Sequence, residues 1–261
     1  MQQCCYPPFF SFLPEEKKNG NSDHIDRIDL IELFICVFGK EKIGVVFGDR
    51  EFIGDNWLNW LESKNIKYVM RIKEKGQYIS NCRGIFVKAK QLLHSLPVGQ
   101  NVNLGKRILG KGSKFHHYLS ACKCSKTAEL LVVVHSQNID LPCELYKYRW
   151  QIETMFRAFK SSGFNMEDTH ITDSLRLETL FGIMAIAFTI AYDIGDEYEK
   201  EHPQKIKKHG YKQKSTFKIG LDLILNWLIN YKTKLVSELK RIAKRVSSYW
   251  VSEISEVKSV V

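Results

Sequence analysis

The sequence IGVVFGDREFIGDNWLNWLESKNIKYVMRI, residues 43–72, contains the alternation that decides the fold. Its first residues form a short apolar run that ends at Asp49, which is typical of a buried strand with an acid at its carboxyl end. Residues 57–61 predict a helix and residues 68–72 predict a second strand. A strand, a helix and a strand in succession favour an α/β fold with parallel pairing.

The regions on both sides of this segment predict further helices and strands. Isoleucines at helical spacing predict a helix over residues 23–38. Residues 76–140 contain clustered glycines and short β-leaning runs at 115–121 and 130–134, and we interpret them as a mostly β insertion. From residue 141 onward the chain is helical in character. We therefore expect an α/β core that is interrupted by a β-rich insertion.

The composition narrows the classes of protein to consider. The 261 residues are 44% hydrophobic, which is enough apolar material for a core and argues against disorder. The 39 Lys and Arg against 29 Asp and Glu give a formal net charge of +10, which favours a polyphosphate partner. The seven cysteines show no disulfide framework, so we expect a reducing cytoplasm. The longest apolar run, residues 180–194, is shorter than the ~20 residues of a membrane span and predicts a buried helix.

The segment LYKYRWQIETMFRAFK, residues 145–160, carries a polar stripe at helical spacing. On a helical wheel the stripe covers an arc of about 60° and consists of Tyr146, Arg149, Glu153 and Lys160. The predicted apolar face consists of Leu145, Ile152, Met155, Phe156 and Phe159. A carboxylate beside a buried face, with cations above and below it, suits an active-site wall that holds phosphates. The alternative is a solvated face on which Arg149 and Glu153 form an i, i+4 ion pair.

Asp49 is the second candidate acid, because α/β folds place catalytic groups at the carboxyl ends of strands. Taken alone, Asp49 is equally explained as a turn acid that caps the next helix or pairs with Arg50. Together, Asp49 and Glu153 are the minimum for holding Mg²⁺ through oxygen ligands. These two residues are therefore the candidate catalytic acids and metal ligands.

Residues 200–218 form a basic block that contains seven lysines and one acid, Glu201, with His, Tyr and Phe between them. This composition suits phosphate contacts with some stacking, and the alternative is a solvated linker. The candidate DNA-binding lysines of this block are Lys207, Lys208, Lys212 and Lys214.

Residues 116–124 contain four side chains that are able to bind metal, namely His116, His117, Cys122 and Cys124. Their spacing fits no standard zinc site. Strand alternation would also point the two histidines to opposite faces of a sheet. We therefore do not expect zinc here.

Several segments resemble insertion-sequence DDE transposases. GDREFIGDNWLNWL at residues 48–61 and YVMRIKEK at 68–75 resemble the region of the second aspartate. The pattern Tyr146-x2-Arg149-x3-Glu153-x6-Lys160 is similar to the Tyr-Arg-Glu-Lys signature of the insertion-sequence-four family. GNSDHIDRIDLIELF at 20–34 and HGYKQKSTFKIGLD at 209–222 resemble the helix before that aspartate and the later basic block. The resemblance covers nearly the whole chain.

The resemblance implies the ribonuclease-H-like fold of a bacterial DNA transposase, with a mixed sheet and a β insertion between the second aspartate and the glutamate. Three carboxylates would hold two Mg²⁺ ions, for which Mn²⁺ substitutes, and the ions would serve an in-line displacement at a phosphodiester. Asp49 resembles the second acid and Glu153 the third. The residues implied to contact phosphates and transposon ends are Tyr146, Arg149 and Lys160.

The same resemblance sets the expected domain boundaries. Residues 1–75 would be the first, incomplete part of the core and residues 76–140 the β-rich insertion. Residues 141–230 would be the second part of the core, with the catalytic helix and the basic block. Residues 231–261 would form a basic amphipathic helix and tail.

The first aspartate of the family lies upstream of the point where this chain begins, and so does the end-recognition domain. The nearest acids, Asp23, Asp26 and Asp29, belong to the predicted helix of residues 23–38, and we do not expect any of them to substitute. We therefore expect a truncated or frameshifted transposase catalytic domain that is inactive alone.

Two other functions remain open. A non-catalytic remnant or regulator of an intact transposase would bind DNA with the same affinity in EDTA. An unrelated basic α/β protein would keep Asp49 and Glu153 apart. The expected partner is DNA, both as transposon ends and as target; a homodimer is a candidate assembly, and we expect no membrane contact.

Overall fold

In the computed structural model of the chain, the structure is described for residues 23–125, 127–161, 164–207 and 212–257. The described residues fall into two compact units, of which the first ends at Glu153 and the second begins at Thr154. We call them the sheet unit and the helical unit, and each is described by itself. The predictions for residues 1–22 lie outside the described ranges.

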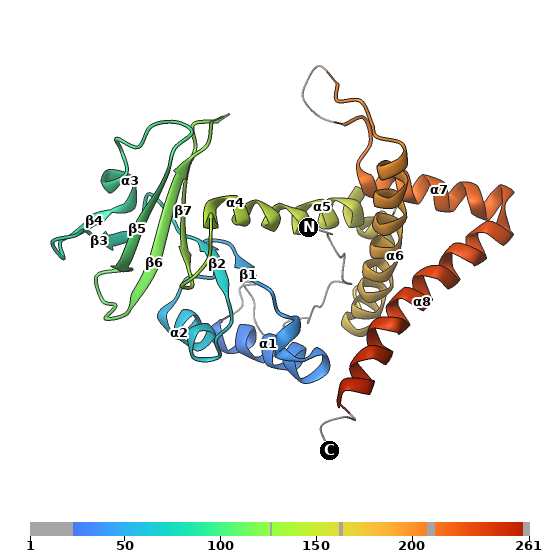
Figure 1. Cartoon of the computed structure of the whole chain (residues 1–261), viewed down its shortest axis with the longest axis horizontal. Helices are drawn as coiled ribbons and strands as arrows, with labels where there is room; N and C mark the ends of the chain where they lie inside the picture. The colour runs from blue at the N-terminus through green and yellow to red at the C-terminus, as the bar shows by residue number, and fades with distance from the viewer. Residues whose placement is uncertain (1–22, 126, 162–163, 208–211, 258–261) are drawn as a thin grey trace. The chain divides into compact units, whose positions relative to one another are not determined.

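The sheet unit is built on a mixed sheet with the strand order β1-β2-β7-β6-β5 (Figure 1). The bounds are Val46–Gly48 for β1, Tyr68–Arg71 for β2, Asn101–Ile108 for β5, His116–Lys123 for β6 and Leu130–His135 for β7. β1 and β2 run parallel and are joined by helix α2 (Asp55–Ser63), as the strand–helix–strand pattern predicts, and the other neighbours are antiparallel. The predicted α/β class is confirmed, and the mixed sheet is consistent with a ribonuclease-H-like fold.

Most strands of the predicted insertion join the core sheet. β7 pairs with β2 on one side and β6 on the other, and β5 pairs with β6. The runs predicted at 115–121 and 130–134 are β6 and β7. A hairpin of β3 (Tyr78–Ser80) and β4 (Phe86–Lys88) is followed by the short helix α3 (Ala89–Leu92). The bridge between Ile79 and Leu109 joins this hairpin to the residue that follows β5.

Alternate residues of β2 face two different apolar clusters. Tyr68 and Met70 belong to the cluster that α2 covers, and α2 contributes to it the buried side chains Trp57, Leu58 and Leu61. Val69 belongs to the second cluster, together with side chains from helix α4 (Pro142–Leu145) and the 3-10 turn Tyr146–Arg149. A slip of β2 by one residue would move every side chain to the opposite face of the sheet. Because both faces are buried, the packing fixes the register of β2 and with it the position of its last residue.

Helix α1 (His24–Phe38) confirms the helix predicted over residues 23–38. Its N-terminus is closed by a capping box, in which Asp23 accepts a hydrogen bond from the backbone of Asp26 and the Asp26 side chain accepts one from the backbone of Asp23. Of the four isoleucines that predicted the helix, Ile28, Ile31 and Ile35 pack against the first cluster, whereas Ile25 is exposed.

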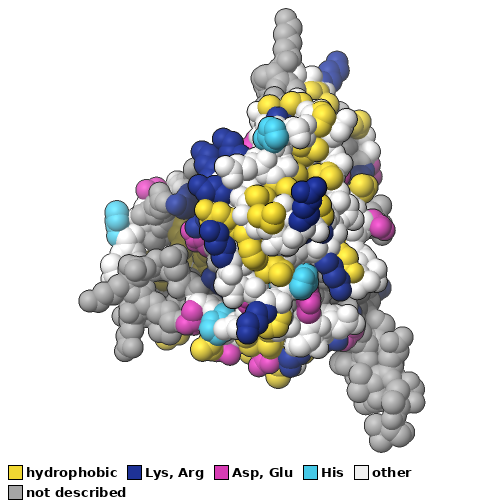
Figure 2. Space-filling model, turned by 90° about the vertical axis from the view of Figure 1, so that its left-hand side faces the viewer, with side chains coloured by type: hydrophobic (Ala, Val, Ile, Leu, Met, Phe, Trp, Pro, Cys, Tyr) yellow, Lys and Arg dark blue, Asp and Glu magenta, His cyan; other side chains and the backbone are white. Residues whose placement is uncertain are grey.

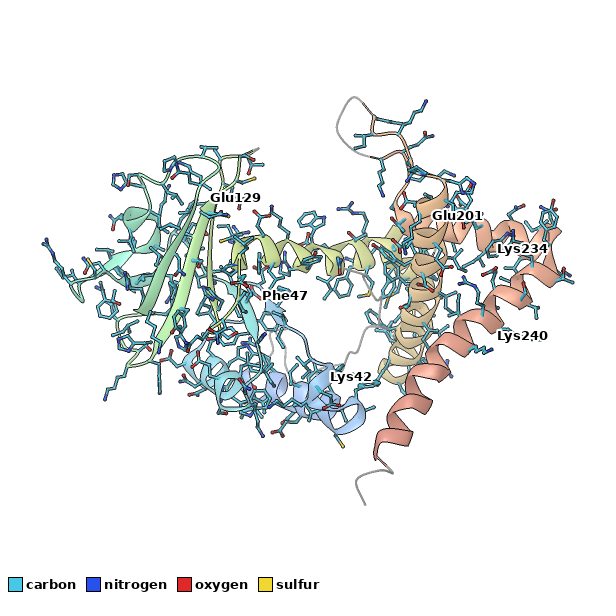
Figure 3. The ribbon with its side chains drawn as sticks, in the orientation of Figure 1. Lys42, Phe47, Glu129, Glu201, Lys234 and Lys240 are labelled. Atoms are coloured by element: carbon cyan, nitrogen blue, oxygen red, sulfur yellow. The ribbon has the colours of Figure 1, made fainter. Side chains whose placement is uncertain are left out.

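Helix α5 (Trp150–Ser161) continues the chain into the helical unit, which holds the 3-10 turn Met166–Thr169 and helices α6 (Ser174–Glu201), α7 (Thr216–Asn230) and α8 (Lys232–Val257). Contacts between aromatic rings connect α5, α6 and α7. The Phe188 ring of α6 lies 6.0 Å from Phe159 of α5 and 4.8 Å from Phe217 of α7. Lys234 and Lys240 project from α8 (Figure 3).

Helices α6 and α7 approach each other most closely at two glycines. A Cβ atom on Gly195 would lie 2.0 Å from the carbonyl oxygen of Thr216, and one on Gly220 would lie 1.7 Å from that of Ala191. Both contacts are with backbone, which cannot turn aside as a flexible side chain can. The crossing therefore requires glycine on both helices.

Helix α6 is longer than the apolar run from which it was predicted. It has 28 residues, and Leu175–Glu201 is apolar and long enough to cross a membrane by length and composition, with 28% of the 18-residue window buried. The prediction that this segment is too short is wrong for the helix as formed. The prediction of a buried helix is also wrong for Ile183 and Ile186, which are 60% and 56% exposed. One such helix is weak support for a membrane span, because core helices of water-soluble domains meet the same criteria.

Candidate active site at the ends of strands β1 and β2

Asp49 directly follows β1, whose residue Phe47 is labelled in Figure 3. The residue between them, Gly48, is buried, and a Cβ atom on it would lie 2.3 Å from Met70 Sδ and 2.8 Å from Phe52 Cβ. The Asp49 carbonyl oxygen also accepts a hydrogen bond from the Phe52 amide at 2.8 Å. The contacts of β2 and of this turn with Gly48 thus fix where Asp49 leaves the sheet.

The interpretation of Asp49 as a cap of the next helix is wrong. Helix α2 begins after Gly54, and its N-terminus has no side-chain cap. Instead, Asp49 Oδ1 accepts a hydrogen bond from the Arg50 amide at 2.7 Å and lies 3.9 Å from Arg50 Nε. The alternative contact with Arg50 is therefore present, and it uses one of the two carboxylate oxygens.

One guanidinium, that of Arg149, contacts both candidate acids. Its Nη1 lies 3.9 Å from Asp49 Oδ2, and its Nη2 donates a hydrogen bond to Glu153 Oε1. The i, i+4 pair of the alternative interpretation is thus formed. It does not lie on a fully solvated face, since the Arg149 and Glu153 side chains are 21% and 35% exposed. The acids predicted from separate patterns lie on two sides of a single cation.

The segment that carries Arg149 is not a regular α-helix throughout. Residues 146–149 form a 3-10 turn, which advances by about 120° per residue instead of 100°. The apolar face drawn with α-helical spacing is accordingly only partly correct. Met155 and Phe159 are buried, but Ile152 and Phe156 are 47% and 40% exposed. Lys160 is exposed on the part of α5 that belongs to the helical unit.

Two buried donors in this region lack partners. Among the described residues, neither the Tyr146 hydroxyl nor Arg71 Nε has a hydrogen-bond partner. Burial raises the pKa of Tyr146 to about 12, with the negative charge of Asp49 acting in the same direction and the Arg149 charge against it. Tyr146 therefore keeps its proton near neutral pH. A buried donor without a partner costs about 1–3 kcal/mol, which a bound oxygen would recover.

Arg71 is a site residue that the sequence analysis missed. Gly48 of β1 pairs with Met70 of β2, so Arg71, the last residue of β2, lies at the same edge of the sheet as Asp49. Its Nη2 donates a hydrogen bond to Glu129 at 2.7 Å, and its charge acts on Tyr146. The available signal was the position of Arg71 one residue before the end of the second predicted strand, residues 68–72.

The acids of the site fit a divalent cation in part. Carboxylate oxygens are the ligands that Mg²⁺ prefers, and Asp49 and Glu153 already flank a cation. However, within the part of the chain that the structure describes, no three His, Cys, Asp or Glu side chains are grouped closely enough to hold a metal ion.

Residues 116–124 contain the two histidines whose side chains were predicted to point to opposite faces of a sheet. His116 is exposed and His117 is fully buried, as strand alternation predicts. His117 lies between the sheet and α2, where its ring nitrogens are 3.5 Å from Glu62 Oε1 and 3.8 Å from Asp55 Oδ1.

A comparison with known families excludes one of the remaining interpretations. The family model described as "Transposase DDE domain" matches residues 22–190, which is more than half of the chain. The chain belongs to the transposase DDE domain family. An unrelated basic α/β protein is therefore excluded. No curated protein matches the chain. The part of this transposase domain that the family model matches contains Asp49, Tyr146, Arg149, Glu153 and Lys160, and it ends before the basic block.

The basic block of the transposase domain is organised by a buried acid. Glu199 of α6 is 9% exposed and accepts hydrogen bonds from Thr216 Oγ1 and Gln204 Nε2, both at 2.5 Å, and from Lys212 Nζ at 3.0 Å. Burial by itself raises the pKa of Glu199, but these donors outweigh burial and leave the pKa below its usual value. The sequence analysis missed Glu199, since a single acid in a helix gives no local signal.

The candidate DNA-binding lysines of the block differ in their contacts. Lys214 donates a hydrogen bond to Asp222 at 2.7 Å, and Lys212 is paired with Glu199. Lys207 is exposed. Lys208 lies outside the described residues. The block is therefore held in place partly through the same lysines that were predicted to contact DNA.

Proposed function

We propose that this transposase DDE domain takes part in metal-dependent cleavage and strand transfer of DNA at transposon ends, as a member of the insertion-sequence-four family. The observation that carries the proposal is the approach of Asp49 and Glu153 to the guanidinium of Arg149. In the proposed site both acids hold Mg²⁺, for which Mn²⁺ substitutes. The tyrosine, the arginine, the glutamate and the downstream lysine of the family signature occur in register from Tyr146 to Lys160.

Arg149 has two successive roles in this proposal. When bound, the metal supplies Lewis acidity and neutralises charge at the reacting phosphate. Before that, the guanidinium of Arg149 neutralises the two carboxylates that would otherwise repel each other. Released from them, its planar fork suits two oxygens of a DNA phosphate. The same side chain thus neutralises the two acids before metal binds and contacts the substrate afterwards.

Tyr146 and Arg71 supply donors that are ready for the substrate. Both have a buried polar atom that lacks a partner among the described residues, and a phosphate oxygen would satisfy them. The raised pKa of Tyr146 favours a hydrogen-bond donor over a general base. We therefore propose that Tyr146 positions DNA and does not accept a proton.

The DNA surface is proposed to extend beyond the acids. Figure 2 shows Lys and Arg side chains spread over the face of the sheet unit that it displays, in keeping with the formal net charge of +10. Five lysines that follow Glu153 in the sequence are proposed to add phosphate contacts, namely Lys160, Lys207, Lys208, Lys212 and Lys214. A homodimer on DNA and a cytoplasmic location belong to the same proposal.

We further infer that the chain is catalytically incomplete. A site with three carboxylates needs one acid more than the two that the described residues bring together. Asp23 and Asp26 are engaged in the capping box of α1, which supports the expectation that they do not serve as that acid. Loss of one ligand from a two-metal site removes most turnover.

Metal binding and strand cleavage test these statements separately. Mn²⁺ binding followed by electron paramagnetic resonance should detect a site that Asp49→Asn and Glu153→Gln each weaken by at least about tenfold. Asp140→Asn is the matched control, because Asp140 is an exposed acid outside the site. Unchanged Mn²⁺ binding in both site variants would contradict the proposed metal ligands. Mn²⁺-dependent cleavage by the chain alone, lost in Asp49→Ala, would contradict incompleteness while supporting the proposed chemistry.

The second candidate function is a DNA-binding remnant or regulator without catalysis. The observation that favours it is the missing third ligand among the described residues, combined with the basic composition. Fluorescence anisotropy with duplex DNA should then give the same affinity in EDTA and in Mg²⁺. An affinity that rises with Mg²⁺ and loses this dependence in Glu153→Gln would favour the metal-dependent function.

A further inference from the structure

The positive charge of the chain comes from one segment of the sheet unit. Residues 75–128 contain ten Lys and Arg and not one Asp or Glu. In the rest of the chain the other 29 Lys and Arg are balanced by all 29 acids, so this segment accounts for the entire formal net charge of +10. It contains β3, β4, α3, β5 and β6. A polyanionic partner of this chain is therefore expected to bind this segment.

The lysines of this segment also differ in their contacts from those of the basic block. Four lysines of the block each form an ion pair with an acid, namely Lys200, Lys212, Lys214 and Lys218. By contrast, five lysines of the segment are exposed and form no ion pair within the described part of the chain, namely Lys88, Lys90, Lys106, Lys111 and Lys114. An ammonium group that faces a carboxylate has to leave it before it binds a phosphate, whereas an unpaired one does not. The unpaired lysines are therefore the stronger candidates for phosphate contacts.

Two of these lysines lie beside the same tyrosine. Lys88 of β4 is the register partner of Tyr78 of β3, so both side chains leave the same face of the hairpin. In the loop after β5, the Gly110 amide donates a hydrogen bond to the Tyr78 carbonyl oxygen at 2.8 Å. The next residue, Lys111, brings its Nζ to 4.3 Å from the centre of the Tyr78 ring. Strand pairing and a backbone hydrogen bond thus bring two lysines to one tyrosine.

A second lysine–tyrosine contact occurs on strands β5 and β6. Lys106 of β5 is the register partner of Tyr118 of β6, and its Nζ lies 5.2 Å from the centre of the Tyr118 ring. A cation–π contact orients an ammonium group and does not neutralise its charge. Like charges that are held in this way repel each other, and a bound anion reduces the repulsion. The two tyrosines thus orient the lysines, and the phosphates of a ligand would supply the opposite charge.

We propose that residues 75–128 form a metal-independent surface for the backbone phosphates of duplex DNA, in which Lys88 and Lys111 beside Tyr78 hold one phosphate. Figure 1 places β3, β4 and α3 at one side of the sheet unit, and Figure 2, which views this side, shows Lys and Arg side chains distributed across it. Cations that are spread over a face match a row of phosphates, whereas a small anion would use only one position. Contacts with phosphates carry no sequence information, so the surface binds duplexes of any sequence.

This inference rests on the proposed function for the identity of the polyanion, and it names the surface that binds it. It also changes the relative weight of the candidate contacts. The acid-free segment, and not the basic block of residues 200–218, would supply most of the affinity that salt weakens. Asp49 and Glu153 take no part in this binding, so it persists in EDTA.

Fluorescence anisotropy with a duplex of arbitrary sequence, in EDTA and over a range of KCl concentrations, tests the surface. Each lysine that contacts a phosphate contributes about 0.9 to the slope of log K against log salt. The double variant Lys88→Gln, Lys111→Gln should therefore lower the slope by about 1.8 and weaken binding at low salt by at least about tenfold. The matched control is Lys64→Gln, Lys200→Gln, which removes the same charge from two exposed lysines that are already paired with acids and should leave both quantities nearly unchanged. Lys88→Arg, Lys111→Arg should bind like the wild type.

Lysine acetylation of the wild-type chain gives a second measurement that needs no variant. Mass spectrometry should find Lys88 and Lys111 acetylated in the free chain and protected in the complex with duplex DNA. Lys64 and Lys200 should be acetylated to the same extent in both.

Three outcomes overturn the proposed surface. Equal losses of affinity in the two glutamine double variants would show that binding follows net charge alone. Acetylation of Lys88 and Lys111 in the complex would show that DNA binds elsewhere, and a wild-type chain that binds no duplex in EDTA would have no such surface. A failure of the proposed function is distinguishable, because Mn²⁺ binding by the free chain is measured without DNA. A chain that binds DNA through Lys88 and Lys111 but binds no Mn²⁺ would retain the surface and lose the proposed catalysis.

Discussion

The acids of the two units are satisfied to different degrees. In the helical unit, Glu199 is almost fully buried and accepts hydrogen bonds from three side chains on the block that follows it. In the sheet unit, Asp49 and Glu153 are more than a third exposed and share one guanidinium. Near them, two buried donors have no partner among the described residues.

This difference separates a structural acid from candidate catalytic acids. An acid whose oxygens are filled by protein donors stabilises the fold and has no capacity left for a ligand. Acids that share a single cation still have carboxylate oxygens that can bind a ligand, and nearby donors without partners among the described residues can form hydrogen bonds to it. The contrast predicts that substitutions around Glu199 change stability, whereas substitutions around Asp49 change binding.

The largest effect is expected for Glu199→Ala. The substitution removes an acceptor of three hydrogen bonds, one of them from the charged Lys212, and should lower the free energy of unfolding by about 3 kcal/mol. Urea denaturation measures the loss. The matched control is Glu201→Ala, two positions later and exposed, which should change stability by no more than about 0.5 kcal/mol. Equal effects of the two variants would contradict the structural role.

The same acid should make stability depend on pH. The pKa of Glu199 is lowered in the folded chain, so its contribution is complete above the pKa of the unfolded state, about 4.3, and is lost as pH falls through the folded value. The difference in unfolding free energy between the wild type and Glu199→Gln should therefore shrink between about pH 6 and about pH 3. A difference that stays constant over this range would show that the charge of Glu199 contributes nothing.

Gly48→Ala tests whether backbone packing sets the position of Asp49. Met70 is fully buried, so its sulfur has little room to avoid the new methyl group, and the loss of stability should be about 1–3 kcal/mol. Gly44→Ala is the matched control, because a Cβ atom there meets nothing within 4 Å. The double variant Gly48→Ala, Met70→Ala should show a coupling that relieves part of the clash. If thermal denaturation finds Gly48→Ala as stable as Gly44→Ala, the steric argument is wrong.

The local pattern was sufficient to predict the elements that carry Asp49 and Glu153. The apolar run before Asp49 and the repeat from Tyr146 to Lys160 are properties of neighbouring residues, and the structure contains β1 and α5 at these places. The 3-10 turn at residues 146–149 differs from the predicted helix because an apolar repeat does not distinguish the two helical forms over one turn.

Contacts between distant segments could not be predicted in this way. The pairing of β2 with β7 joins residues more than 60 positions apart, and the clash that excludes a side chain at Gly48 comes from β2 and the following turn. The roles of Arg71 and Glu199 likewise depend on partners that the chain brings near only when folded. Sequence periodicity reports which face of an element is buried, not which element covers it.

Arg149→Ala sharpens the contrast on the side of the candidate site. Removal of the guanidinium frees both carboxylates, so the dissociation constant for Mn²⁺ in the absence of DNA should fall about tenfold, which corresponds to ~1.4 kcal/mol. Arg50→Ala is the matched control and should have a smaller effect, because Arg50 lies near one oxygen of Asp49 only. Isothermal titration with Mn²⁺ measures both. Weaker Mn²⁺ binding in Arg149→Ala would mean that the arginine organises the acids and does not occupy the place of a metal.

The smallest effect on stability is expected for Tyr146→Phe, and its sign is informative. The variant removes a buried hydroxyl that lacks a partner among the described residues, so the free energy of unfolding should stay the same or rise by up to about 1 kcal/mol. If this hydroxyl receives a phosphate oxygen, the affinity for duplex DNA should fall several-fold in the same variant. Tyr148→Phe, at an exposed tyrosine two positions away, should change neither quantity. A loss of stability with unchanged DNA binding would mean that Tyr146 is a structural residue, as Glu199 is. The functional interpretation of the sheet unit would then depend on Asp49, Arg149 and Glu153 alone.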